Sequence, residues 1–318
     1  MRLPYPSYTE PFSAAHALAL GHTLAELRQA QRAGRLIRLR RGVYIVAEAR
    51  RAATHNDPVL HAQDIAALSL AMPRRRLVAV DTSAARIHGL AVRDSYPNDL
   101  AVAVEGRQGT HGTHRDGYFL RVARLPDHHL ETKHGVLVTT PARTVLDVAA
   151  HHGLDNGVVA ADAGYKGKLF TPTLLRATVD ELERRPGIEV IRDCVEFADP
   201  ACESVLESIS RLSMREIGIP MPATQVTLYD DGYITIRVDF YWEPLLLVGE
   251  ADGESKYTMD GRDPMASLRA QQERERILRE LGFDIVRWNW HVANNPRLLG
   301  ARLRSAFARA EERRGHVG

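Results

Sequence analysis

Apolar residues recur at helical spacing near the start of the chain. Thr23-Leu-Ala-Glu26 has the form of a capping box, in which the Thr and Glu side chains bond each other's backbone amides at a helix start. Leu27 and Ala30 lie on one face of the helix that this box opens, and Gly34 suits the position just after its end. The pattern predicts a helix over residues 24–33.

This helix is flanked by elements that together form a known supersecondary order. An apolar segment, 12–20, predicts a preceding helix, and β segments at 35–39 and 43–46 surround the turn Arg40-Arg41-Gly42. Helix, turn, helix and hairpin in this order are typical of a winged helix-turn-helix, whose second helix enters the DNA major groove while the wing follows phosphates. The expected DNA contacts are Arg28, Gln29, Gln31, Arg32, Arg38, Arg40 and Arg41. A merely solvated basic face is the alternative.

The middle of the chain mixes helical and strand patterns. Helices are expected at 59–71, at 81–88 and from Pro141 to about residue 150, and strands at 76–80, 100–104, 117–123 and 136–139. A histidine-rich stretch invites a metal site, but it has no nearby cysteine and no helix with two histidines four residues apart. Those histidines are His111, His114, His128, His129 and His134.

The last third predicts the order α-β-β-β-α-β. Asp199-Pro200 is expected to open a helix that runs to Ile217 and carries Glu203 and Glu207 on one stripe. Strands at 224–229, 233–241 and 245–251, a helix at 264–281 and a strand at 283–290 follow. The fold class is therefore α/β multidomain, divided into residues 1–57 (winged helix-turn-helix), 58–153 (α+β), 154–198 (helical connector) and 199–318.

Carboxylates in this last segment suggest a metal site. A turn at Glu243-Pro244 would place Asp239 opposite Val248 and diagonal to Glu250, about 7–8 Å away, so both could reach one Mg²⁺ or Mn²⁺ ion. Glu203 or Glu207 would complete the ligands. A carboxylate-held metal neutralises a scissile phosphate and generates hydroxide. Asp252 shares the face of Glu250, and Lys256 follows in the loop, where a lysine can orient or deprotonate the attacking water.

Composition narrows the class of protein. The 318 residues are 44% hydrophobic and 26% charged, and no apolar run approaches the roughly 18 residues that cross a bilayer, so we expect a cytoplasmic protein without a membrane partner. The two cysteines fit neither a disulfide framework nor a zinc clip. The net charge of +2 conceals six arginines without an acid between Leu27 and Ala47, and twelve acids against four bases between Asp199 and Asp260.

The C-terminal motifs resemble those of the PD-(D/E)XK endonuclease superfamily, in particular its very-short-patch-repair branch. They are Glu203-Ser-x-x-Glu207, Arg237-Val-Asp239-Phe, Glu250-x-Asp252-Gly253, Lys256-Tyr257, Gln272-Glu-Arg274 and Gly282-Phe-x-x-Val-Arg-Trp288. The resemblance implies a restriction-endonuclease-like domain with Asp239 and Glu250 as metal ligands, a helix glutamate as accessory ligand, and DNA cleavage. Asp252 stands where the superfamily usually has lysine, which leaves the water-positioning role open between Asp252 and Lys256.

The first 150 residues resemble the antitoxin of the abortive-infection AbiE (type IV) systems. The motifs, in order, are Gly34-Arg-Leu-x-Arg-Leu-x-x-Gly-Val-Tyr44, Ser83-Ala-Ala-x-x-His-Gly-Leu90 and Thr139-Thr-Pro-Ala-Arg-Thr-Val-Leu-Asp147. This resemblance implies an operator-binding regulator with a nucleotidyltransferase-like toxin as partner. Two functions follow: a metal-dependent DNA endonuclease or nickase targeted by its winged helix, or a non-catalytic repressor whose nuclease fold clamps DNA or forms a homodimer. An RNA-binding head is a third, less supported by the few interleaved aromatics.

Overall fold

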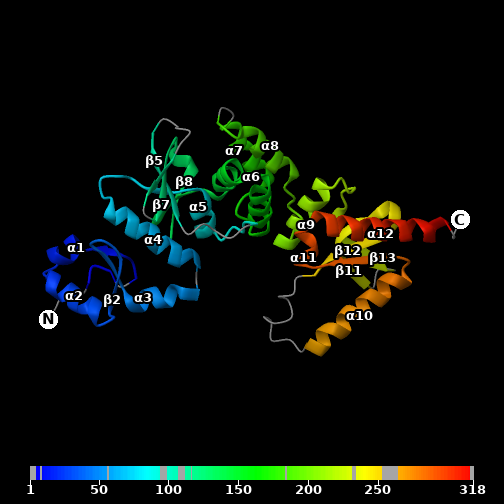
Figure 1. Ribbon diagram of the computed structural model, residues 1–318, viewed down its shortest axis with the longest axis horizontal. Coiled ribbons are helices and arrows are strands. Elements are labelled where there is room, and N and C mark those ends of the chain that lie inside the picture. The colour runs from blue at the N-terminus through cyan, green and yellow to red at the C-terminus, as the bar shows by residue number, and fades with distance from the viewer. Residues whose placement is uncertain are drawn as a thin grey trace. The chain divides into compact units, whose positions relative to one another are not determined.

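A computed structural model describes residues 5–7, 9–55, 57–93, 99–106, 112–115, 117–182, 185–230, 234–252 and 264–315. It is a mixed α/β structure with several sheets, divided into two compact units (Figure 1). The first unit comprises residues 1–164 and 169–196, and the second comprises residues 165–168 and 197–318. The boundary expected at 198 lies close to this division, whereas those expected at 57 and 153 fall inside the first unit.

The first unit begins with a small sheet and two helices. The strands are β1 (Phe12–Ser13), β2 (Leu36–Arg40) and β3 (Val43–Val46), in the order β1-β3-β2, and the helices are α1 (Ala14–Ala19) and α2 (Leu24–Arg32). The predicted capping box is confirmed, because Thr23 Oγ1 accepts from the Glu26 amide at 3.2 Å and Glu26 Oε2 accepts from the Thr23 amide at 3.0 Å. Leu27 and Ala30 are buried in the core below this helix, as their spacing predicted.

The helix expected at 12–20 was placed two residues too early. Phe12 is a buried strand residue that pairs with Tyr44, and Ser13 caps the helix by accepting a hydrogen bond from the His16 amide at 3.1 Å. Apolar periodicity alone does not distinguish a buried strand residue from the first turn of the helix that follows it.

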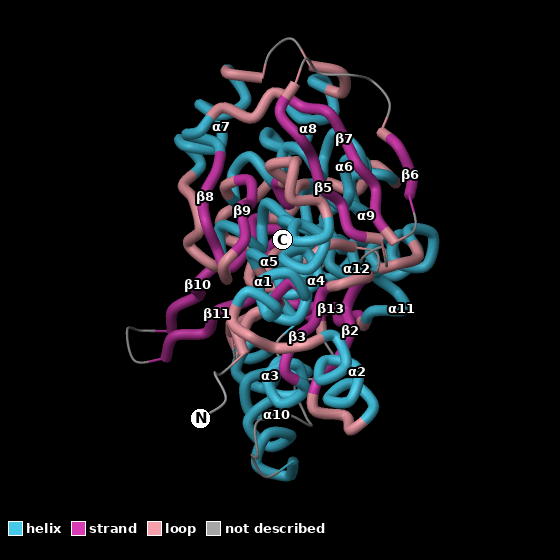
Figure 2. Tube along the Cα trace, turned by 90° about the vertical axis from the view of Figure 1, so that its left-hand side faces the viewer, coloured by secondary structure: helices cyan, strands magenta, loops and turns pink. Residues whose placement is uncertain are grey.

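A six-stranded sheet forms the centre of the first unit (Figure 2). Its order is β6-β7-β5-β4-β9-β8. The strands are β4 (Val78–Ala79), β5 (Leu100–Glu105), β6 (Thr113–Arg115), β7 (Tyr118–Ala123), β8 (Leu130–Lys133) and β9 (Val136–Thr139). The helical segments are α3 (Ala47–Ala52), η1 (Ala53–His55), α4 (Asp57–Ala71), α5 (Asp81–His88), η2 (Asp127–His129), α6 (Pro141–Lys166), α7 (Pro172–Asp180) and α8 (Ile188–Phe197).

The two faces of this sheet pack into two different clusters of apolar side chains. Ile65 of α4 and Ile87 of α5 pack with Val102 and Val138 on one face. Ala101 and Ala103 of β5 alternate to the other face. The predicted strands match β4, β5, β7 and β9, but β6 and β8 were not predicted, since neither short segment alternates apolar and polar residues. The helix expected from Pro141 continues to Lys166, with non-helical backbone at Gly153 (φ 86°).

The sheet of the second unit has three antiparallel strands and a fourth strand, at its edge, that is parallel to its neighbour. Its strands are β10 (Ala223–Asp230), β11 (Ile234–Trp242), β12 (Leu247–Ala251) and β13 (Asp284–Trp288), in that order, with β12 and β13 parallel. The helical segments are α9 (Val205–Glu216), η3 (Glu243–Leu245), α10 (Pro264–Glu280), α11 (Trp290–Ala293) and α12 (Pro296–Gly315). The predicted α-β-β-β-α-β order is confirmed, whereas α11 and α12 were not predicted.

The start of α9 and one strand register differ from the predictions. Ser204, not Asp199, caps α9, and the Asp199 carboxylate instead accepts from the Ala201 amide at 2.9 Å. Tyr241, not Asp239, pairs with Val248, because η3 and the left-handed Leu246 (φ 47°) lengthen the turn. A two-residue shift leaves each side chain on its predicted face, whereas a one-residue shift would have reversed it.

Candidate functional site

The surface of α2 presents the residues expected to read DNA. Arg28, Gln29, Gln31 and Arg32 are all exposed, since Leu27 and Ala30 turn the opposite face into the core. The helix carries basic and amide side chains without an exposed apolar residue between Arg28 and Arg32. These four residues are called the α2 surface below.

The arginines of the β2–β3 hairpin are not equivalent. Arg38 and Arg41 are exposed. Arg40 is half-buried: its Nη2 donates to the Gly117 carbonyl oxygen at 3.4 Å, and its guanidinium lies 5.9 Å from the centre of the Tyr118 ring. Arg40 therefore connects the hairpin to the start of β7, while Arg38 and Arg41 are available to a polyanion.

Three of the carboxylates expected to bind a metal lie near one another in the second unit. Glu207 comes from the first turn of α9, Asp239 from β11 and Glu250 from β12. Gln225 links two of them, since its Nε2 donates to Glu207 Oε2 at 2.8 Å and to Asp239 Oδ1 at 3.2 Å. Asp239 Oδ2 also accepts from the Ala251 amide at 2.9 Å. Glu207, Asp239 and Glu250 are called the acidic cluster below.

Glu250 is held by two arginines. Arg274 Nη2 lies 2.6 Å from Oε1 and Arg287 Nη2 lies 3.4 Å from Oε2. Burial raises the pKa of Glu250, the two guanidiniums lower it in part, and the nearby Asp239 and Asp252 charges raise it. Burial likewise raises the pKa of Glu207, against hydrogen bonds from the Glu203 amide, Ser204 and Gln225.

The other residues expected at a nuclease site lie in different surroundings. Glu203 precedes α9 rather than lying on it, and its Oε1 pairs with Arg237 Nη1 at 2.8 Å. Asp252 follows β12, and its amide donates to the Trp288 carbonyl oxygen at 2.9 Å. Lys256 lies outside the described residues. The prediction that Glu203 and Glu207 lie on one stripe of a helix is therefore wrong, because the helix begins only after Ser204.

The acidic cluster does not fit a preformed magnesium site in this arrangement. Each of its three carboxylates already accepts from an amide, a hydroxyl or a guanidinium, and Arg274 holds a positive charge against Glu250. Mg²⁺ requires carboxylate oxygens and waters in near-octahedral geometry. In the described residues, the acidic cluster does not bring three ligand atoms within 4.8 Å of one another. A metal would have to displace existing donors.

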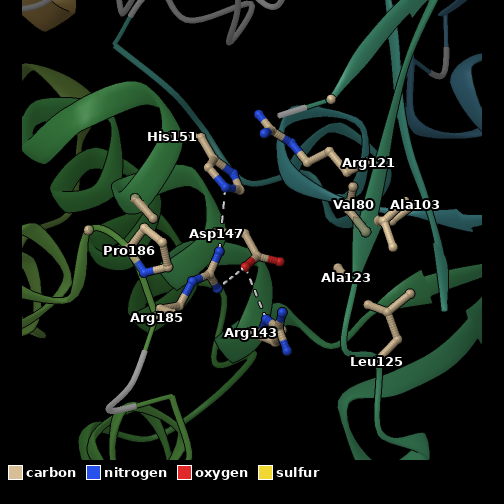
Figure 3. Close-up of a pocket in the computed structure, with 14 residues that line it drawn as sticks. Val80, Ala103, Arg121, Ala123, Leu125, Arg143, Asp147, His151, Arg185 and Pro186 are labelled. Carbon is tan, nitrogen blue, oxygen red and sulfur yellow. Dashed lines mark hydrogen bonds and ion pairs between the residues drawn. The ribbon is translucent and has the colours of Figure 1, made fainter. Parts of the chain in front are cut away.

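A cavity of about 150 Å³ lies between the central sheet of the first unit and α6 (Figure 3). Apolar side chains from the sheet side, among them Val80, Ala103 and Leu125, form one wall. The opposite wall carries the charged residues Arg143, Asp147 and His151 of α6 with Arg185 from the segment between α7 and α8, and Arg121 of β7 also lines the cavity. We call this the α6 cavity.

A continuous set of polar contacts surrounds the α6 cavity. Asp147 accepts from Arg143 Nε at 3.0 Å and from Arg185 Nη1. The Arg185 Nη2 atom lies 3.5 Å from His151 Nε2. Because an arginine only donates, His151 Nε2 accepts, and its Nδ1–H then donates to Asp81 Oδ2 at 3.0 Å. Arg185 and Asp147 are both buried, so bulk water does not compete for the contact between them.

Asp81 and Asp147 both remain ionised. Burial alone would raise the pKa of Asp81, but the hydrogen bonds that its carboxylate accepts from His151 and His152 lower it. Asp147 is fully buried, which would raise its pKa, and the charges of Arg143 and Arg185 lower it overall. Asp81 also accepts from Arg121 Nη2 at 3.2 Å and has a left-handed backbone (φ 57°), an unusual conformation for this residue.

One part of the histidine-rich stretch has ligand-like geometry. His128, His129 and Glu181 bring three ligand atoms within 4.8 Å, with His128 Nε2 at 2.6 Å from Glu181 Oε2. However, Arg143 Nη1 lies 3.0 Å from His129 Nδ1, so Nδ1 must accept and the neutral ring carries its proton on Nε2. That proton opposes a metal at Nε2. His111 lies outside the described residues.

The α6 cavity was not predicted as a site from the sequence. Arg143 and Asp147 belong to the motif that opens α6, where their spacing of four residues indicates one helix face. Arg121 and Arg185 come from segments far away in the chain, so only the fold brings them together. An arginine–aspartate pair on an otherwise apolar helix face was the available signal.

Comparison with known proteins matches the part of the chain that contains most of this cavity. Residues 77–163 match the family model of the AbiEi antitoxin C-terminal domain. Two proteins of Mycobacterium tuberculosis, the uncharacterized proteins MT2308 (strain CDC 1551 / Oshkosh) and Rv2248 (strain ATCC 25618 / H37Rv), are each 29% identical over 189 residues. Each alignment covers 59% of this chain and 67% of the relative. The match supports an antitoxin-like domain from β4 into α6.

Proposed function

We propose that the protein is a DNA-binding transcriptional regulator of the antitoxin type, in which residues 9–46 act as a winged helix-turn-helix. The α2 surface carries this proposal, because it is an exposed set of arginines and glutamines on the second helix. The antitoxin-like segment at 77–163 supports the regulatory role. Among the described residues, the helices include none that is both long and apolar enough to cross a membrane.

Each part of the winged helix has a distinct task in this proposal. Arg28 and Arg32 have the chemistry to donate two hydrogen bonds to a guanine edge, and Gln29 and Gln31 can pair with adenine. Arg38 and Arg41 contact phosphates, which contribute affinity and salt dependence without reading sequence. Arg40 is assigned to packing against Tyr118 rather than to DNA.

Binding to the protein's own upstream region tests this function. A mobility-shift titration with that duplex and with a shuffled duplex of equal length is expected to give at least about 10³-fold tighter binding to the upstream DNA. Equal affinity for both duplexes at matched salt would reject a sequence-reading regulator. The duplexes should remain intact throughout.

Partner proteins follow from the same proposal. An antitoxin acts together with a toxin, and the resemblance of the first 150 residues implies a nucleotidyltransferase-like one. Co-expression with a toxin encoded beside this chain should relieve growth arrest. Light scattering of the isolated chain tests the homodimer, whose two α2 surfaces would contact half-sites separated by one turn of DNA.

Metal-dependent DNA cleavage is the second candidate function. The order α9-β10-β11-β12-α10-β13 and the gathering of the acidic cluster favour a restriction-endonuclease-like domain. No catalytic step is assigned, because Arg274 and Arg287 hold Glu250 where a cation would bind. Incubating plasmid with the protein and Mg²⁺ or Mn²⁺ tests this function, with Asp239→Ala as control. Cleavage by the wild type alone would establish it, and no difference between the two would exclude it.

A further inference from the structure

Two buried guanidinium nitrogens at the α6 cavity lack a hydrogen-bond acceptor in the described part of the chain. They are Nε of Arg121 and Nε of Arg185, and both residues line the cavity. The Arg185 side chain is only 5% exposed, so bulk water does not satisfy it. Buried donors are almost always paired in native proteins, and an unpaired one indicates a missing acceptor such as a water or an ion.

The charges around the cavity leave room for an anion. Arg121, Arg143 and Arg185 contribute three positive charges, and the contacts described above supply two carboxylates, Asp81 and Asp147. Each arginine contacts a carboxylate, but Arg143 and Arg185 share Asp147, so among these described residues the positive charges exceed the negative ones by one. His151 contacts both Arg185 and Asp81 and adds no carboxylate to this count.

The two carboxylates also hold the arginines in place. Asp147 fixes Arg143 and Arg185 from one side, while Asp81 fixes Arg121. Prepositioned donors lose little side-chain entropy when a ligand binds. The apolar wall of Val80, Ala103 and Leu125 lowers the local dielectric, which strengthens the attraction between a guanidinium and an anion.

The size of the cavity limits what can enter. A volume of about 150 Å³ equals roughly five waters at about 30 Å³ each. A tetrahedral oxyanion with five heavy atoms fits this space, whereas a whole nucleotide does not. Arginine's planar fork is also the side chain best matched to phosphate oxygens.

We propose that the α6 cavity binds a phosphate-sized oxyanion through Arg121, Arg143 and Arg185. The ion is either free inorganic phosphate or the terminal phosphate of a larger molecule. Four of the cavity's polar residues, Arg121, Arg143, Asp147 and His151, fall within the segment matched at 77–163, but Arg185 lies beyond it. The site therefore depends on a residue outside the matched segment, and the proposal does not rest on DNA binding.

Titration calorimetry of the full chain tests the site directly. The probes are inorganic phosphate and phenyl phosphate, with chloride at matched ionic strength as the non-oxyanion control. We expect a dissociation constant below about 1 mM for at least one phosphate probe and no saturable heat from chloride. Tighter binding of phenyl phosphate would identify the source as a phosphomonoester, and tighter binding of inorganic phosphate would identify the free ion. Absence of binding by both probes overturns the proposal.

Matched variants separate a ligand site from a structural cluster. Arg121→Lys and Arg185→Lys keep the positive charge but lose the fork, so each should weaken phosphate binding at least about tenfold. Arg176→Ala, which removes an exposed arginine of α7 outside the cavity, should leave the affinity within about twofold. Thermal unfolding with and without phosphate provides the second measurement. If the lysine variants lower the melting temperature but gain as much from phosphate as the wild type, the cluster is only structural.

Discussion

Arg274 places its Nη2 atom 2.6 Å from Oε1 of Glu250, so a positive charge already neutralises the carboxylate that was expected to bind a metal. Arg287 approaches the other oxygen at 3.4 Å. The two guanidiniums thus supply the positive charge beside Glu250 that a bound divalent ion would otherwise supply. The consequence is a competition between arginine and metal that can be measured.

Removing Arg274 should make the second unit sensitive to magnesium. Arg274→Ala leaves a nearly buried glutamate with one distant partner, which should cost about 1–2 kcal/mol, less than a fully buried pair because Arg274 itself is 38% exposed. Millimolar Mg²⁺ should restore part of this loss, but barely change the wild type. Thermal unfolding with Mg²⁺ and with EDTA measures both effects.

Arg276→Ala provides the control for that experiment, because Arg276 is on the same helix and pairs only with Glu273 and Glu280 among the described contacts. It should leave the free energy of unfolding nearly unchanged and show no magnesium response. A wild type stabilised by Mg²⁺ as strongly as Arg274→Ala would contradict the competition.

The two neighbouring arginines of the hairpin should give opposite phenotypes. Arg40→Ala removes the contacts with Gly117 and Tyr118, so we expect a loss of about 1 kcal/mol in unfolding free energy. Arg41→Ala should leave stability unchanged and lower the slope of log affinity for DNA against log salt by about 1. Denaturant unfolding and binding at several salt concentrations separate the two. A salt-slope change in Arg40→Ala without destabilisation would reverse the assignment.

The α2 surface should control sequence preference. Arg28→Ala or Arg32→Ala is expected to reduce affinity for the upstream DNA by about 1–3 kcal/mol, with a much smaller effect on a shuffled duplex. Arg176→Ala in α7 is the matched loss of one exposed arginine and should affect both duplexes little. Equal losses on both duplexes would limit Arg28 and Arg32 to phosphate contacts.

Local sequence patterns predicted the helices and strands well, but they did not predict the contacts between segments that are far apart in the chain. Thr23 and Glu26 specified a helix start, and the alternation in β11 kept Asp239 on its correct face despite a register two residues away from the expected one. The contact of Glu250 with Arg274 and Arg287 was not predicted, because residue type alone cannot distinguish a metal ligand from a buried ion-pair partner. Arg185 bonds to Asp147, which lies 38 residues earlier in the chain, and the spacing of apolar residues carries no information about such a contact.

Gly249 should be essential to the stability of the second unit, because there is no room for a side chain at this position. A β-carbon there would lie 2.8 Å from Trp288 Cη2, 2.9 Å from Trp242 Cζ3 and 3.1 Å from Phe240 Cβ. Phe240 and Trp288 are stacked with ring centres 5.3 Å apart, and the Trp288 indole donates to Ser210 Oγ at 2.7 Å, so the rings have little freedom to move. Gly249→Ala should cost about 1–3 kcal/mol, measured by urea unfolding. A change below about 0.5 kcal/mol would mean that the rings can shift.

Two buried histidines should make the first unit sensitive to mild acid. Burial lowers the pKa of both His61 and His88 to about 4. His61 Nε2 lies 2.8 Å from Ser83 Oγ, and His88 Nε2 donates to the Thr139 carbonyl oxygen at 2.7 Å. The unfolded chain takes up these protons near pH 6.5, whereas the folded chain resists until about pH 4, so stability must fall as the pH falls through this window.

Replacing one of these histidines with glutamine isolates its contribution. His88→Gln keeps an amide donor for Thr139 but no longer titrates, so its stability should depend less on pH than that of the wild type. Between pH 7 and pH 5 the difference should reach about 2 kcal/mol, since one unit of pKa shift corresponds to about 1.4 kcal/mol. His16→Gln makes the same substitution at an exposed histidine and is the matched control. Urea unfolding at a series of pH values measures these slopes, and parallel profiles for His88→Gln and the wild type would show that His88 is protonated equally in both states.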